Sequence, residues 1–290
     1  MHEVLAKGIL SASNGMNIYR GCTHGCIYCD SRSHCYQMKH DFEDIEVKSN
    51  ATILLEETLK RKRNKCMIST GAMTDPYIPL EGTLQHTRRC LELINEYEFG
   101  VAIQTKSANI LRDIDLLASI NEKSKCIVEM TLTTYDEELC KILEPRVSTT
   151  KERLKALTVI RDRGIQTVVW LSPILPYIND TKENIMGILE YCKEAKVYGI
   201  ICFNMGVTLR EGNREYFYQM LDRYFPGLKE RYINIYGNSY EIVSQNNKQL
   251  MDIFYKFCKE NHIVSDVNTI FSYMRAYEDK QYKQIQFRFD

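Results

Sequence analysis

The sequence lacks net charge, long apolar runs and linker-like stretches. Its 38 Lys and Arg residues balance 38 Asp and Glu residues, which argues against a protein that coats nucleic acid through bulk electrostatics. No stretch approaches the roughly 18 apolar residues that a membrane span requires, and the first residues lack the pattern of a signal peptide. Because no Ser/Gly/Pro-rich linker divides the chain, we expect one domain, located in the cytoplasm, with no membrane partner.

Cysteine is the residue that stands out in an otherwise ordinary composition. Charged residues make up 26% and hydrophobic residues 44% of the 290 residues, which is typical of a globular protein and disfavours disorder. The 11 cysteines are an odd number, so they cannot all pair within the chain. In a reducing compartment we expect them to be buried thiols, metal ligands or redox groups.

Short apolar segments alternate with amphipathic ones along the chain. We expect strands where short apolar runs close in polar residues. These runs are residues 17–20, 66–70, 101–105, 126–132, 166–171 and 199–203. Helical patterns lie at 83–97, 150–163 and 180–193. This order predicts an α/β fold, namely a partial (βα)6 TIM-like barrel over residues 1–230. A helical C-terminal cap on the same domain is expected over 231–290.

The residues that follow the predicted strands are the first site candidates. In a barrel of parallel strands, chemistry gathers on the loops after the strands' carboxyl ends. The polar residues at these positions are Asp75, Lys106, Thr131, Thr133, Ser172 and Asn204. The dense basic run at 61–65 is expected at the opposite end, where it suits a solvated helix terminus.

Three cysteines after the first predicted strand form the strongest motif. Cys22, Cys26 and Cys29 have the spacing C-x3-C-x2-C, and Gly21 and Gly25 allow the backbone to turn tightly around a bound group. Closely placed thiolates repel one another unless a cation holds them. The spacing therefore predicts a metal centre.

The residues alone leave the kind of centre open. A zinc site needs a fourth ligand, which would have to be Cys35, His24 or His34. An iron–sulfur cube normally takes four cysteines, so a set of three leaves one iron open to a non-protein ligand. A chance grouping of core cysteines is the remaining alternative.

This motif in a six-unit barrel resembles that of the radical S-adenosylmethionine (SAM) enzymes. The resemblance implies a [4Fe–4S] cluster on the three cysteines, with SAM bound to the open iron. One-electron reduction would then release a 5′-deoxyadenosyl radical that abstracts hydrogen from a substrate. It also implies an electron donor such as flavodoxin or ferredoxin. Tyr28, just before the third cysteine, is expected to lie against the adenine.

Further motifs narrow the resemblance to the spore photoproduct lyase-related group. They lie at residues 19–29, 74–77, 104–107, 143–146 and 173–176. The resemblance implies that SAM is held by Thr74, Asp75, Lys106 and Thr131. A lysine ammonium suits the methionyl carboxylate, and hydroxyl groups suit the ribose. Further candidates are Ser172, for the cofactor, and Arg146, Ser172 and Asn204, for the substrate side.

Two positions depart from the pattern of that group. The resemblance implies a tyrosine directly after the third cluster cysteine and a hydrogen-donating cysteine on the second strand. This chain has Asp30 and Ala72 at those positions, and alanine has no S–H bond from which to return a hydrogen atom. Cys35 is then the candidate for a substitute hydrogen donor.

We therefore predict a radical SAM enzyme, of lyase or oxidoreductase type, that acts on an unidentified substrate. A nucleic acid partner is not favoured by the neutral net charge. Two alternatives remain, namely repair of thymine lesions by lyase-like chemistry, and a non-enzymatic iron–sulfur protein with an accessory or redox-sensing role. Asp75 and Lys106 favour the enzyme, because a purely structural cluster would not need them.

Overall fold

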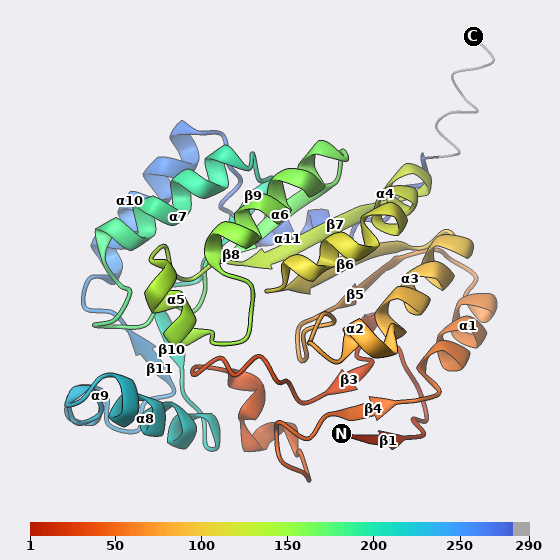
Figure 1. Ribbon diagram of the computed structural model, residues 1–290. Coiled ribbons are helices and arrows are strands. Elements are labelled where there is room, and N and C mark those ends of the chain that lie inside the picture. Colours follow the sequence, from red (N-terminus) through yellow and green to blue (C-terminus); the bar gives the residue numbers. More distant parts are fainter. Residues whose placement is uncertain (281–290) are drawn as a thin grey trace.

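A six-stranded parallel sheet forms the centre of the computed structural model, which describes residues 1–280 (Figure 1). Its strands, in spatial order, are β2 (Gly15–Met16), β5 (Met67–Thr70), β6 (Gly100–Thr105), β7 (Cys126–Thr131), β8 (Gln166–Trp170) and β9 (Gly199–Ile201). Every neighbouring pair is parallel. The spatial order of the strands follows their order in the chain, and the sheet is open. This arrangement is that of a partial TIM-like barrel, which confirms the predicted fold class.

The first strand of the barrel lies earlier than predicted. Residues 17–20 do not pair with β5; instead β3 (Tyr19–Arg20) joins a second sheet with β1 (His2–Val4) and β4 (Glu46–Lys48). The backbone oxygen of Ile18 accepts a hydrogen bond from the Lys48 amide at 3.1 Å. The polar groups of this stretch are thus satisfied by β4 rather than by the barrel, which an apolar pattern alone does not reveal.

Helices cover the outer face of the sheet (Figure 1). They are α1 (Ala51–Arg61), α2 (Glu81–Leu84), α3 (His86–Glu96), α4 (Ile114–Lys123), α5 (Glu137–Leu143), α6 (Thr150–Asp162) and α7 (Lys182–Glu194). The predicted helix 83–97 is divided at Gln85, whose φ of 54° is left-handed. Helix α7 begins after Thr181, whose side chain caps the Asn184 amide. Leu55, Ile94 and their apolar neighbours on these helices form the main core against the strands.

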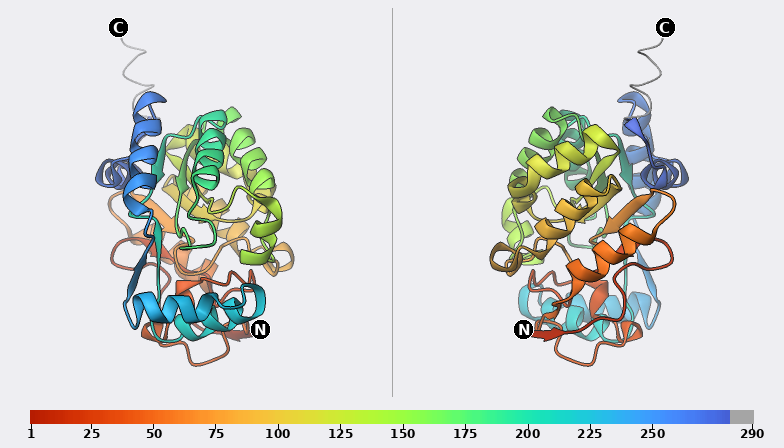
Figure 2. Two further views of the ribbon diagram at one scale, coloured as in Figure 1. Left: turned by 90° about the vertical axis from the view of Figure 1, so that its left-hand side faces the viewer. Right: turned by 90° about the vertical axis from the view of Figure 1, so that its right-hand side faces the viewer.

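The C-terminal third closes the other side of the sheet. Its elements are β10 (Gly206–Thr208), α8 (Asn213–Tyr224), α9 (Leu228–Tyr236), β11 (Glu241–Val243), α10 (Asn247–Glu260) and α11 (Val267–Arg275). Figure 2 shows α10 and α11 on the side of the sheet opposite α3, α4 and α6. The stretch expected as a helical cap also holds β11, which pairs antiparallel with β10. Its residues 281–290 lie outside the described part of the chain.

The inner face of the barrel changes character along the strands. At one end, an apolar layer is covered by Ile270 and Met274 of α11. This layer is Met67, Ala102, Ile127, Val168 and Ile201. Because side chains alternate along a strand, the next side chains that point into the barrel come two residues further along each strand. These side chains are polar or aromatic, and beyond them the strands end.

No helix within residues 1–280 is long and apolar enough to cross a membrane.

Candidate functional site

The three cysteines lie in the loop between β3 and the 3₁₀ helix Asp30–Arg32. Gly21 has a φ of 89°, and a Cβ there would stand 2.5 Å from the carbonyl oxygen of Phe42, so only glycine fits this close turn. The Cys22 amide donates to that same oxygen at 3.1 Å, and the Ile27 amide donates to the Leu143 oxygen at 3.0 Å. The loop is therefore fixed by its neighbours on both sides.

The three cysteine thiols are not gathered as closely as the ligands of a single ion. Among the residues described, the set of ligand atoms that all lie within 4.8 Å of one another contains no cysteine. Four thiolates on one zinc at about 2.3 Å would stand closer together than this, whereas a four-iron cube separates its ligands more widely. Burial raises the pKa of the Cys22 thiol to about 12, so a positively charged group must be present before these thiols can become ligands.

The fourth zinc ligands that the sequence offered are engaged elsewhere. Nδ1 of His24 lies 3.6 Å from Oδ2 of Asp75. His34 is exposed beside Glu211, and the Cys35 sulfur accepts a hydrogen bond from Arg210 at 3.3 Å. The three-cysteine arrangement is thus compatible with a cube that keeps one iron open.

A cavity of about 430 Å³ opens beside the cysteines, and we call it the strand-end cavity. Predicted residues in its wall are Cys26, Tyr28, Cys29, Lys106, Ser172 and Asn204. The structure thus brings together two cluster cysteines, the expected aromatic residue, and residues at the ends of β6, β8 and β9. Asp30 and Ala72, the two departures from the lyase pattern, also line it.

Lys106 carries a positive charge in the wall of this cavity. Burial alone would lower the pKa of its ammonium group, but the negative charges of Cys26 and Glu144 outweigh burial and raise the pKa. Its Nζ lies 5.9 Å from the centre of the Tyr28 ring. The ammonium and the ring therefore face the same space.

Asp75 holds the backbone around Lys106 and does not line the cavity. Its Oδ2 accepts from the Lys106 amide at 2.7 Å, and its Oδ1 accepts from the Thr105 hydroxyl at 2.7 Å and the Tyr77 amide at 2.8 Å. With its carboxylate occupied in this way, Asp75 can position Lys106, but little of it remains for a ligand.

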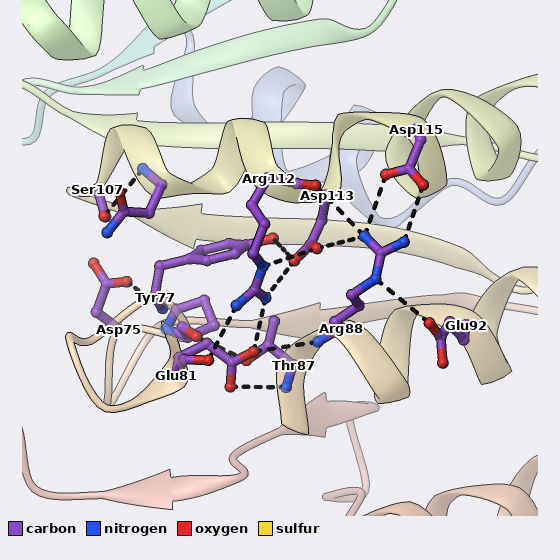
Figure 3. A network of polar contacts seen from close by, with 12 residues as sticks. Asp75, Tyr77, Glu81, Thr87, Arg88, Glu92, Ser107, Arg112, Asp113 and Asp115 are labelled. Carbon is purple, nitrogen blue, oxygen red and sulfur yellow. Dashed lines mark hydrogen bonds and ion pairs between the residues drawn. The ribbon is translucent and has the colours of Figure 1, made fainter. Parts of the chain in front are cut away.

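A buried charge network supports Asp75 from behind (Figure 3). The Tyr77 hydroxyl donates to Asp113 at 3.1 Å, and Arg112 lies between Asp113 and Glu81, at 2.6 Å and 2.8 Å. Asp113 and Glu81 are almost fully buried. Each buried acid has a cationic partner, which is the condition under which buried carboxylates are tolerated.

Tyr28 is anchored by a second buried pair. Its hydroxyl donates to Glu144, which also forms an ion pair with Arg153. Burial opposes ionisation of Glu144, but Arg153 and Lys106 hold the pKa of this carboxyl below its usual range. From the motif at residues 143–146, the sequence predicted Arg146 as a substrate-side residue. The structure leaves Arg146 exposed, and Glu144 is the residue that supports the site.

Three predicted residues, Thr74, Thr131 and Cys35, do not line the strand-end cavity. Thr74 and Thr131 are buried next to the cavity rather than in its described lining. Cys35 is exposed and also outside that lining. It reaches the cavity wall only through neighbours: Arg210 contacts both Cys35 and Tyr36, and the Tyr36 hydroxyl donates to Asp30 at 2.8 Å.

A second cavity, of about 600 Å³, lies deeper in the barrel, and we call it the lumen cavity. Ala72 lines both cavities, so they adjoin. Glu129 is buried in the lumen cavity, and its Oε2 accepts from the Trp170 indole at 2.7 Å. Burial raises the pKa of Glu129 to about 7. Sequence reasoning missed this residue, because a glutamate inside an apolar run gives no motif.

Comparison with known proteins agrees with this geometry. The family model of the radical SAM superfamily matches residues 16–188, which is more than half of the chain. An uncharacterized protein of Mycobacterium tuberculosis is 30% identical over 250 residues, which are 81% of this chain and 73% of that protein. An uncharacterized protein of Methanocaldococcus jannaschii is 32% identical over 174 residues, 59% of this chain and 64% of that protein.

Solved structures resemble the fold. A point mutant of spore photoproduct lyase aligns with a TM-score of 0.63 at 14% identity, over 89% of this chain and 78% of that chain. The lyase complexed with a dinucleoside spore photoproduct aligns with a TM-score of 0.62 at 13% identity, over the same shares of 89% and 78%. At such low identity the likeness shows the barrel and its extension, while the chemistry has to be argued from the site.

Proposed function

This chain belongs to the radical SAM superfamily, whose members use a [4Fe–4S] cluster and SAM, and on that premise we propose how its own residues serve the reaction. The observation that carries the proposal is the shared wall of the strand-end cavity, where Cys26, Cys29 and Lys106 meet. Cys22, Cys26 and Cys29 would hold the cluster. When bound and reduced, the cluster supplies the electron that cleaves SAM to methionine and a 5′-deoxyadenosyl radical.

We assign the SAM-binding roles from the position of each side chain. Lys106 pairs with the methionyl carboxylate, because it is a partly buried cation in the same cavity wall as Cys26 and Cys29. Tyr28 lies against the adenine, with its ring held in place by Glu144. Asp75 is a positioning residue, because its oxygens bind the Lys106 backbone rather than face the cavity. Contacts from Thr74, Thr131 and Ser172 stay predictions.

The lumen cavity is our proposed place for the substrate. It adjoins the strand-end cavity at Ala72, so a hydrogen atom on a ligand there would lie next to the radical's origin. Trp170 and Phe271 offer flat apolar surfaces, with ring centres 6.0 Å apart. Within residues 1–280 Glu129 accepts a hydrogen bond from Trp170 and forms no ion pair. A substrate with an N–H donor directed at Glu129 would compensate this buried acid.

We retain Cys35 as the proposed hydrogen donor; its exposed thiol lines neither the strand-end cavity nor the lumen cavity, so direct transfer requires the thiol to move toward the substrate. In this step the thiol transfers one hydrogen atom to a carbon radical on the substrate. The resulting thiyl radical is returned to the thiol by one electron from the external donor and one proton. Arg210 and Tyr36 connect Cys35 to Asp30 in the cavity wall. Because the thiol acts after SAM cleavage, Cys35→Ala should leave reductive cleavage unchanged; loss of cleavage would assign Cys35 to the cluster instead.

The enzyme assignment is tested by anaerobic reconstitution followed by SAM and dithionite. The wild-type chain should release 5′-deoxyadenosine, measured by liquid chromatography, and Cys26→Ala should not. Cys66→Ala is the matched control, because Cys66 is a partly buried thiol just before β5 and outside the lining of the strand-end cavity. Equal amounts from wild type and Cys26→Ala would leave the non-enzymatic accessory role as the better explanation.

A separate assay addresses repair of thymine lesions. Asp30 and Ala72 occupy the positions where the lyase-related pattern has a tyrosine and a cysteine, so we expect no restoration of thymine from a dinucleoside spore photoproduct. Turnover of that compound to thymine, above the Cys26→Ala background, would show that these two positions do not decide the substrate.

A further inference from the structure

A second group of metal-ligating side chains lies away from both cavities, where β1 meets β4. The ligand atoms of His2, His40 and Asp44 all lie within 4.8 Å of one another. Nδ1 of His2 is 2.9 Å from Oδ2 of Asp44, and the centres of the two imidazole rings are 4.7 Å apart. Parallel pairing places His2 opposite Glu46, and Nε2 of His40 lies 3.7 Å from Oε2 of Glu46.

The tautomer of His40 follows from its surroundings. Its Nδ1 lies 3.0 Å from the backbone oxygen of Asp41, and since a carbonyl only accepts, Nδ1 carries the hydrogen in this contact. Nε2 then holds a lone pair, and this atom is buried without a hydrogen-bond partner. Metal-bound histidines characteristically donate their other N–H to a carbonyl or carboxylate in this way.

We propose that His2, His40 and Asp44 bind one zinc ion, with Glu46 as the neighbouring carboxylate. Two imidazoles and one carboxylate form a donor set that suits zinc, which binds histidine nitrogen and carboxylate oxygen at about 2.0–2.2 Å. The other Asp44 oxygen, Oδ1, is 2.9 Å from the Met1 amino group, which leaves Oδ2 for the ion. This site does not depend on radical chemistry.

The location gives the ion a structural role. His2 lies on β1, while His40 and Asp44 lie in the loop that leads into β4. The same loop contains Phe42, whose carbonyl oxygen accepts the hydrogen bond from the Cys22 amide. Zinc would therefore tie the first strand to the loop that packs behind the cysteines. The side chains of Asp44 and Glu46 are the neighbouring acidic groups that would balance the ion's charge.

Metal analysis of the intact holoenzyme tests this proposal. The full chain, with its cluster reconstituted so that the three cysteines are occupied, is incubated with zinc chloride and desalted. We expect one zinc per chain, with X-ray absorption showing nitrogen and oxygen neighbours only. A sulfur shell would place the zinc on cysteines and overturn the proposal, as would the absence of retained zinc.

Single substitutions then identify the ligands. His40→Ala and Asp44→Asn should each weaken zinc affinity at least about tenfold, measured by competition with a chelator of known affinity. His34→Ala is the matched control, since His34 is an exposed histidine of the neighbouring 3₁₀ helix, and should bind zinc as wild type does. Circular dichroism checks folding, and Asp44→Asn decides the question if His40→Ala unfolds. Unchanged zinc affinity in a folded Asp44→Asn variant would leave only ordinary ion pairs at this place.

Discussion

Two buried glutamates in the same barrel are held in opposite states. Glu144, beside the strand-end cavity, is 2% exposed and Glu129, in the lumen cavity, is 4% exposed. Arg153 and Lys106 keep the pKa of Glu144 low, against the effect of burial. Burial raises the pKa of Glu129 to about 7, because the Trp170 indole opposes this only in part and Glu129 has no ion-pair partner within residues 1–280. Burial alone thus does not decide the state of an acid; the nearest cation does.

The difference between the two glutamates separates a region whose buried acid is paired within the protein from a region whose buried acid could be paired by a ligand. Beside the cysteines, the buried Glu144 and Arg153 already form an ion pair within the protein, as expected for a scaffold that must hold its cofactors rigidly. Glu129 forms no ion pair within residues 1–280, and Arg275 is the cation that shares the lining of its cavity. Substitutions at the two glutamates test this contrast, and the largest loss of stability is expected at Glu144.

Breaking the Glu144–Arg153 pair should have the largest effect. Glu144→Gln leaves Arg153, which is 0% exposed, without its counter-charge in the interior. Removing one partner of a buried ion pair typically costs about 3–5 kcal/mol of stability, and we expect a loss of that order in urea denaturation of the apoprotein.

The control for this measurement is Glu138→Gln, an exposed acid paired with Lys141 on α5. Exposed ion pairs contribute about 0–1 kcal/mol, so this variant should unfold nearly as wild type does. A similar small change in Glu144→Gln would mean that the interior around Arg153 is not closed to water, and the contrast with Glu129 would disappear.

Titration of Glu129 should make stability fall with rising pH. Its carboxyl has a pKa of about 7 in the folded chain against an ordinary value of 4.5, so the folded state binds the proton more tightly. This contribution is complete below pH 4.5 and is lost as the pH rises through 7, by about 2 kcal/mol between pH 5 and 8. Glu129→Gln should remove this part of the pH dependence, measured as unfolding free energies at both pH values.

Trp170 gives a second readout of the same titration. It is the one tryptophan in the sequence, and its indole donates to Glu129, so the intrinsic fluorescence should change with a midpoint near pH 7 in the wild type and not in Glu129→Gln. A midpoint near 4.5 would show that Glu129 is well solvated, and the lumen cavity would then lose its argument for an N–H donor ligand.

The parts of this molecule that the sequence predicts are those encoded locally. The Cys22–Cys29 motif, most barrel strands and Lys106 follow from spacing and alternation, which depend on near neighbours in the chain. Glu129 was missed because its partner, Trp170, lies 41 residues further along the chain. The lumen cavity likewise forms only when segments from several strands meet.

The contrast between the two metal-ligand groups has the same origin. The three cysteines lie within eight consecutive positions, 22–29, whereas His2 and Asp44 are 42 residues apart and meet through the pairing of β1 with β4. The predicted position of the first barrel strand, at residues 17–20, was wrong for a related reason. Residues 17–20 look like a strand and are one in part, but their partner is β4, a choice that depends on tertiary structure.

The smallest of the expected effects concerns Lys106 and the way it recognises SAM. If its ammonium pairs with the methionyl carboxylate, Lys106→Met should weaken SAM binding to the holoenzyme by at least about tenfold, since hydrogen bonds to charged groups contribute about 1.5–3 kcal/mol. The affinity of 5′-deoxyadenosine, which has no carboxylate, should change little. Equilibrium dialysis under anaerobic conditions measures both ligands. Equal weakening of the two affinities would mean that the charge of Lys106 mainly compensates Cys26 and Glu144 within the protein and does not pair with the carboxylate of SAM.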